Sequence, residues 1–265
     1  MIGISFIVRE TSLRCFRDGG MPMKSKGMIL LVACILLGVV FGVPSQHDMA
    51  DHVWKAAESP AVVLDPGHGG MDGGAESADG TVEKDINLAI ALKLRNRLEA
   101  EKLKVVMTRD GDKGLYDDSE AASIRSMKTQ DMKERKRIID ESGAELAVSI
   151  HLNSFTQDRS VKGAQVFFSS DADEDIVRES EAAAHILQQL LNREINTDKK
   201  RSELGKSDVF ILRAPAVPVV IVECGFLSNR EDAENLENED FQDRIAEELC
   251  RGICDYVNRD KCGNQ

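Results

Sequence analysis

LAVSIHLNS, residues 146–154, begins with a near-continuous apolar run and leads into a histidine and an asparagine. A run of this kind predicts a strand that is covered on both faces, as strands in α/β sheets are. Outward from it, strand patterns alternate with helix patterns, which predicts an α/β fold. We expect further strands at 61–65, 104–108, 164–169, 208–212 and 218–223, and helices at 83–101, 131–142, 173–193 and 241–253.

The charge of the chain is uneven along its length. The formal net charge is −12 over 265 residues, and only five basic and two acidic residues lie before residue 47. Residues 47–265 therefore carry 29 basic and 44 acidic side chains. Binding to phosphate backbones needs a basic face, so nucleic acid is not expected to be the main partner.

An apolar segment lies near the N-terminus. MILLVACILLGVVFGV, residues 28–43, is preceded by Lys24 and Lys26. It is shorter than the roughly 20 residues that span a bilayer comfortably, and its basic flank is typical of a signal peptide. A cleaved signal peptide and an uncleaved membrane anchor both remain open, and both imply export. We expect a leader at 1–46, a linker at 47–59, a globular body at 60–258 and a tail at 259–265.

Two polar stretches interrupt the alternation of strands and helices. Residues 110–130 are too many for an ordinary connector, so we interpret them as a flap beside the site or a disordered insertion. Residues 196–207, NTDKKRSELGKS, form a basic loop in an acidic protein. We interpret this loop as a solvated turn in preference to a loop that contacts substrate.

Four side chains suit a catalytic zinc centre. His68, His151 and Glu223 end predicted core strands, where ligand sites form in open α/β sheets, and Glu83 begins a helix after a Gly-rich turn. Two imidazoles and a carboxylate form a common zinc site that leaves one position for water. We expect one zinc ion per chain on His68, Glu83 and His151, with Glu223 as the acid–base catalyst of a metal-assisted hydrolysis.

Each of these residues taken alone has an ordinary explanation. PGHGG suits a tight turn with an exposed His68, and SIHLNS could hold a core histidine that bonds to a backbone carbonyl. Glu83 suits the N-terminus of any helix because of the helix dipole. A lone carboxylate at the end of an apolar strand, such as Glu223, is harder to explain in this way. The four explanations together would require a coincidence of residue type and position.

Six motifs together resemble the zinc-dependent N-acetylmuramoyl-L-alanine amidases of the Amidase_3 family: LDPGHGGMDGGA, EKDINL, MTRD, MKERKRIIDES, SIHLNS and VPVVIVECGFLSN. The resemblance covers about residues 60–258, which would then be a zinc amidase catalytic domain. It implies a single-domain, phosphorylase/hydrolase-like fold of three layers, in which helices flank a twisted mixed sheet. It also implies that the positions of His68, Glu83 and His151 bind zinc and that the position of Glu223 is catalytic.

Three further residues fall in these motifs. Arg109, Arg135 and Asn153 are expected to orient the site or to hold its loops.

The resemblance implies a substrate and a setting as well. The substrate would be a peptidoglycan glycan strand with its stem peptide, cleaved at the amide between N-acetylmuramic acid and L-alanine. The layout is most similar to sporulation-specific members of the family. This similarity implies a role in spore cortex maturation toward muramic-δ-lactam and a location in the forespore intermembrane space. It also implies a membrane tether through residues 28–43 and an accessory sporulation protein as a partner.

Two other classes of function remain open at this point. One is another zinc peptidase, such as a carboxypeptidase of wall peptides, in which Arg109, Arg135 or Arg213 would bind a terminal carboxylate. The other is a non-catalytic wall-binding regulator with a vacant metal site.

Overall fold

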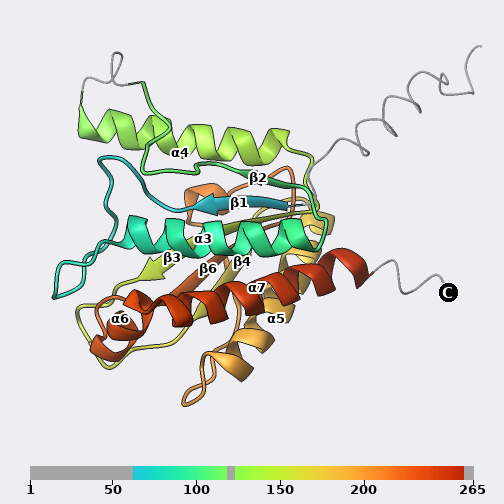
Figure 1. Cartoon of the computed structure of the whole chain (residues 1–265). Coiled ribbons are helices and arrows are strands. Elements are labelled where there is room, and N and C mark those ends of the chain that lie inside the picture. The colour runs from blue at the N-terminus through green and yellow to red at the C-terminus, as the bar shows by residue number, and fades with distance from the viewer. Residues whose placement is uncertain (1–61, 118–122, 260–265) are drawn as a thin grey trace, which may run out of the picture. The chain divides into compact units, whose positions relative to one another are not determined.

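The computed structural model describes residues 62–117 and 123–259 (Figure 1). The elements are β1 (Val62–Pro66), α3 (Glu83–Ala100), β2 (Val105–Met107), α4 (Ile124–Glu141), β3 (Leu146–Asn153), β4 (Gln165–Ser169), α5 (Glu174–Glu194), β5 (Leu204–Lys206), the 3-10 helix η1 (Phe210–Leu212), β6 (Val219–Phe226), α6 (Arg230–Glu237) and α7 (Glu239–Asn258). The predicted leader and linker lie outside these residues. Within the described ranges, no helix combines the length and apolar character needed to cross a membrane.

The strands form one mixed sheet of six strands in the order β2-β1-β3-β6-β4-β5. β1, β3 and β6 are parallel neighbours in its centre, whereas β4 runs antiparallel to β6. β2 and β5 are short strands at the two edges. Three parallel strands therefore end at the same edge of the sheet, next to one another.

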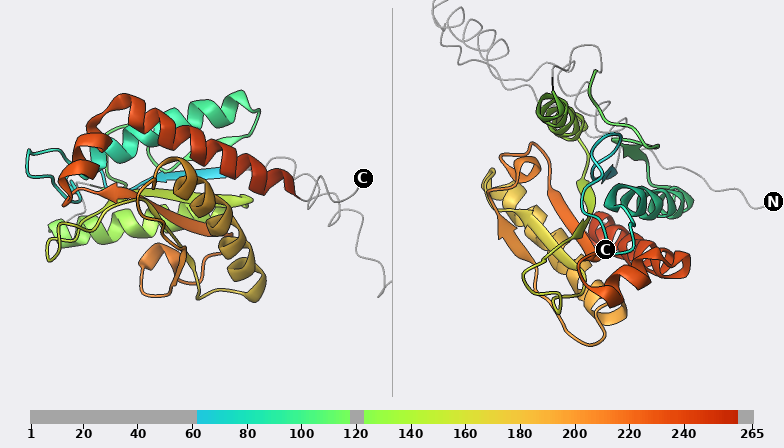
Figure 2. Two further views of the ribbon diagram at one scale, coloured as in Figure 1. Left: turned by 90° about the horizontal axis from the view of Figure 1, so that it is seen from below. Right: turned by 90° about the vertical axis from the view of Figure 1, so that its left-hand side faces the viewer.

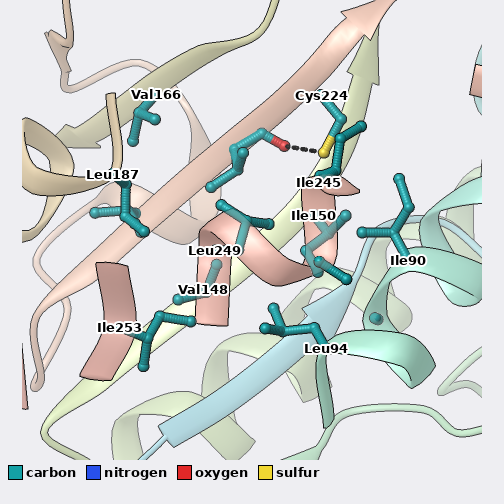
Figure 3. Packing of buried hydrophobic residues seen from close by; sticks show 14 of the residues in the cluster. Ile90, Leu94, Val148, Ile150, Val166, Leu187, Cys224, Ile245, Leu249 and Ile253 are labelled. Carbon is teal, nitrogen blue, oxygen red and sulfur yellow. Dashed lines mark hydrogen bonds between the residues drawn. The ribbon is translucent and has the colours of Figure 1, made fainter. Parts of the chain in front are cut away.

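Helices cover both faces of the sheet, which confirms the predicted α/β fold of three layers. On one face, α3, α5 and α7 pack on the strands, and Figure 3 shows Leu94, Leu187 and Leu249 from these helices around Val148 and Ile150 of β3. On the other face, residues of α4 and η1 form a second and smaller apolar cluster with β1, β3 and β6. The two helical layers are seen in Figure 2 (left), where α3 and α7 lie above the strands and α4 lies below them.

The alternation of side chains along the central strands decides which residues reach the site. Val148 and Ile150 of β3 face α3 and α7. The residues between and after them, Ser149 and His151, point to the face of α4 because the side-chain period of a strand is two. The register pairs His151 with Glu223 of β6, so these two side chains lie on one face.

Two expectations about the elements were wrong. Residues 208–212 are no strand: residues 210–212 form η1, and the fifth strand, β5, lies at 204–206, inside the predicted basic loop. A short apolar run does not separate a strand from a buried helical turn. Here Ile211 and Leu212 are buried beside α4. In addition, the polar stretch 110–130 contains the first turns of α4, which begins after Ser123, whose side chain accepts a hydrogen bond from Ser126 N at 3.2 Å.

We expect Leu94→Ala to lower the free energy of unfolding by about 2–5 kcal/mol, because Leu94 is fully buried between α3 and the sheet and its truncation leaves a cavity. Glu99→Ala, at an exposed position of the same helix, should change it by less than about 0.5 kcal/mol. Urea unfolding of both variants beside the unchanged chain measures the difference. Equal midpoints for all three proteins would contradict the packing of α3 described above.

Candidate metal and catalytic site

The candidate site lies at the carboxyl ends of β1, β3 and β6. His68 follows β1, His151 is near the end of β3, and Glu223 is near the end of β6. Glu83 is the first residue of α3, and the loop between β1 and α3 returns it to the same edge of the sheet. The structure therefore brings together all four side chains that the sequence singled out.

Three donor atoms converge on one point. His68 Nε2 lies 3.2 Å from Glu83 Oε1, and His151 Nδ1 lies 3.0 Å from the same oxygen. One donor atom from each residue falls within 4.8 Å of the other two, which is close enough for a shared metal ion. The two imidazole rings stand nearly perpendicular, at 78°, with centroids 5.0 Å apart.

Two glycines make room for this cluster. A Cβ atom on Gly67 would lie 2.1 Å from the His151 ring, and one on Gly74 would lie 2.5 Å from Glu83 Oε2 and 2.8 Å from His68 Cδ2. Any larger residue at Gly67 would therefore push the His151 ring away. His68 itself has a positive φ of 62°, a conformation that non-glycine residues rarely adopt and that loops at functional sites often retain.

Hydrogen bonds orient the donor groups. His68 Nδ1 lies 2.9 Å from Asp72 Oδ2, and this contact turns Nε2 toward the cluster. Glu83 accepts backbone N–H bonds on both oxygens, from Ala75 at 2.8 Å and from Leu152 at 3.0 Å. These contacts leave each donor little freedom to turn away.

The negative charges around His68 favour a bound cation at this position, whether a proton or a metal ion. Burial lowers the pKa of His68, but hydrogen bonds and charge from Asp72 and Glu83 outweigh burial and raise it to about 9. Burial raises the pKa of Glu83, and the two histidines more than offset this and hold it well below its usual range. The pKa of Asp72 is also lowered, first by its hydrogen bond to His68 and then by Lys128, whose Nζ is 2.7 Å from Asp72 Oδ1.

Glu223 differs from the other carboxylates. Burial raises its pKa to about 7 and the charge of Glu83 adds to this effect, while His151 and His68 act in the opposite direction. Its Oε2 atom is buried and has no hydrogen-bond partner among the described residues. A carboxyl group with a pKa near neutrality can both take up and release a proton, which suits acid–base catalysis.

Arg109 supports the loop from the side of β2. Its guanidinium group is buried and donates to the carbonyls of Pro66 and Gly67, both at 2.9 Å, and of Lys84, at 2.8 Å. One side chain thus connects the segment before His68 with the start of α3.

Arg135 supports the same loop from α4. It donates to Asp65 Oδ1 at 2.7 Å, Asp131 Oδ2 at 2.6 Å and the carbonyl of Pro66 at 2.7 Å, and it also donates to the carbonyl of His68. Both arginines are engaged with oxygen atoms of the protein itself. This disfavours the alternative in which one of them binds a terminal carboxylate.

A cavity of about 340 Å³ opens beside these groups. Asn153 lines it together with both histidines and Glu223, whereas Arg213 does not. The sequence did not indicate several other residues of the lining, namely Asp72, Met132, Phe167, Lys206, Val209, Ile211 and Ile221. Of these, Asp72 could have been found, because it stands four residues after His68 within LDPGHGGMDGGA.

Comparison with known proteins gives consistent results. The germination-specific N-acetylmuramoyl-L-alanine amidase of Bacillus subtilis is 32% identical over 238 residues, which are 89% of this chain and 96% of that protein. AmiA of Escherichia coli, an N-acetylmuramoyl-L-alanine amidase, is 29% identical over 77% of this chain and 78% of its own length. The structure of the CwlD amidase from Clostridioides difficile in complex with the GerS lipoprotein has a TM-score of 0.71 and 37% identity, and it covers 76% of this chain and 99% of that one.

The family itself is matched over the described body. Residues 62–255 fit the family model Amidase_3, described as N-acetylmuramoyl-L-alanine amidase, and this range contains all of the candidate site. The match confirms the resemblance seen in the sequence motifs. The chain belongs to the Amidase_3 family of N-acetylmuramoyl-L-alanine amidases, which are amide hydrolases.

Proposed function

We propose that this protein is a zinc-dependent amidase that hydrolyses the bond between N-acetylmuramic acid and L-alanine in spore cortex peptidoglycan. The observation that carries the proposal is the convergence of His68 Nε2, Glu83 Oε1 and His151 Nδ1 beside the buried carboxyl group of Glu223. Family membership supports the reaction and the peptidoglycan substrate.

The donor set fits zinc. Two imidazole nitrogens and one carboxylate oxygen are the ligands of many catalytic zinc sites, with bond lengths of about 2.0 Å that place tetrahedral ligands about 3.3 Å apart. The separations of 3.2 and 3.0 Å between the imidazole nitrogens and Glu83 Oε1 are close to this value. His68, Glu83 and His151 would therefore hold the ion, and Asp72 would hold the ring of His68 in place.

The protein's own groups perform the proton transfers. When bound, zinc supplies a Lewis acid that polarises the amide carbonyl and acidifies water. Glu223 takes the proton from the attacking water and returns it to the nitrogen of the departing L-alanine. Its Oε2 atom suits this role because it accepts no bond from a described protein group.

The setting is inferred from relatives and from the leader. A B. subtilis relative is named a germination-specific amidase, which supports a role in the spore cortex, where removal of the peptide precedes muramic-δ-lactam formation. The basic and apolar leader, with residues 28–43, supports export and a place in the forespore intermembrane space. The C. difficile neighbour is in complex with a lipoprotein, which favours an accessory partner of this kind.

Removal of metal should abolish peptide release from peptidoglycan, and one equivalent of zinc should restore it. His151→Ala should lose bound zinc, because two donors remain where three converge. His185→Ala is the control, since His185 is an exposed histidine on α5. Elemental analysis and product chromatography measure the two effects. Stoichiometric zinc in His151→Ala, or activity that resists a chelator, would contradict the proposed site.

Glu223→Gln should reduce turnover by about 10²- to 10⁴-fold, the range for loss of a general acid–base group, and should leave zinc bound. Glu203→Gln changes the carboxylate just before β5, which pairs with His185 outside the candidate cavity, and it should keep full activity. Release of peptides with a free L-alanine amino terminus is the measurement. Turnover within a few-fold of the unchanged protein would remove Glu223 from the catalytic role.

Gly67→Ala should lower zinc affinity about 10- to 100-fold, because its Cβ would displace the His151 ring from the cluster. Gly111→Ala provides a matched control, since a Cβ at Gly111 meets no atom within 4 Å. Competition with a zinc-binding dye gives the two dissociation constants. Equal values for both variants would show that the close approach does not control the position of His151.

A further inference from the structure

The cavity that contains Glu223 extends beyond the catalytic atoms. It continues over the face of the sheet toward β4, β5 and η1. The wall of this extension is apolar and comes from α4, the segment around η1 and two strands: Met132, Phe167, Val209, Ile211 and Ile221. No catalytic step proposed above uses this part of the cavity.

Lys206 is a cation in this apolar surrounding. It is the last residue of the edge strand β5, and its Nζ atom lies 5.4 Å from the centre of the Phe167 ring. Within residues 62–117 and 123–259, its ammonium group has neither a hydrogen bond nor an ion pair. A cation over an aromatic ring gains some stabilisation but keeps its capacity to bind an anion.

Apart from Glu223, the other charged groups of the lining are already paired. Arg135 forms ion pairs with Asp65 and Asp131, and Asp72 bonds to His68 and Lys128. Lys206 is therefore the one described cation of the cavity lining that is free for a ligand. The globular body has a large excess of acidic residues, which would repel a carboxylate of the substrate. An unpaired lysine in the cavity offsets this repulsion.

The strand register places Lys206 at a useful distance from the catalytic carboxyl group. Glu223 pairs with Gln165 on β4, and Phe167 lies two residues further along that strand, or about 7 Å away. The ammonium group lies over Phe167. One or two residues of an extended peptide cover such a span, since each adds about 3.3 Å.

We propose that Lys206 binds a free carboxylate of the stem peptide, on the amine side of the scissile amide. This inference rests on the proposed amidase function. The lactyl carboxyl group of the glycan is consumed in the amide itself, so the peptide supplies the nearest free carboxylate. The apolar wall favours the alkyl parts of a peptide over a hydroxyl-rich sugar. The charged contact makes that carboxylate a determinant of specificity.

Two muropeptides that differ only in this group, as a free carboxylate or its amide, test the proposal on the full-length zinc-loaded protein. The unchanged protein should favour the carboxylate form about 10- to 100-fold in kcat/KM, the effect of one hydrogen bond to a charged group. Lys206→Met removes the charge but keeps an apolar side chain, and it should bring the ratio close to one. Lys206→Arg should retain the preference. Lys199→Met is the control: Lys199 belongs to the same basic segment, 196–207, but does not line this cavity, and the variant should behave like the unchanged protein.

Binding provides a readout that does not depend on turnover. In a Glu223→Gln background, calorimetry should show tighter binding of the carboxylate form, and addition of Lys206→Met should remove the difference. A preference that survives Lys206→Met, or equal cleavage of both muropeptides by the unchanged protein, would overturn the carboxylate site alone. Failure of the zinc-loaded protein to cleave intact peptidoglycan would instead falsify the amidase function on which the site rests.

Discussion

The ion pairs of Arg135 are the interaction on which the site depends most. Burial would raise the pKa of Asp65, but Arg135, Ser149 and Thr108 keep that carboxyl group ionised. The same guanidinium group reaches the carbonyl of His68, so one buried residue of α4 holds both the end of β1 and the loop after it. Loss of one partner from a buried ion pair typically costs about 3–5 kcal/mol, because the other charge is left without compensation. The position of the first histidine is therefore coupled to the stability of the fold.

The sequence could predict the parts of the site that follow from strand patterns. The residues at the ends of 61–65, 146–150 and 218–223 meet because parallel neighbours share one edge, and this holds whatever the details of their loops. Glu83 could be placed because the loop between β1 and α3 can fold back to the same edge of the sheet. Apolar periodicity also identified α3, α5 and α7, which bury one face each.

Features that depend on tertiary contacts could not be predicted in this way. Residues 208–212 have the composition of a strand, yet η1 forms because Ile211 and Leu212 pack beside α4. The edge strand at 204–206 is only three residues long and contains a glycine, so only its pairing with β4 defines it. Lys206 was assigned to a solvated turn for the same reason. Its place in the cavity depends on β4 running opposite to β6, which no local pattern encodes.

The sheet separates two groups of residues that face one cavity. The residues of the candidate metal and catalytic site come from the central strands β3 and β6, the loop after β1 and the start of α3. Phe167 comes from β4, and Lys206 comes from the edge strand β5, which has one neighbouring strand only. A mutation on an edge strand disturbs fewer contacts between strands than one in the centre of the sheet. A substitution on β5 can therefore alter the lining of the cavity while the central strands keep their positions.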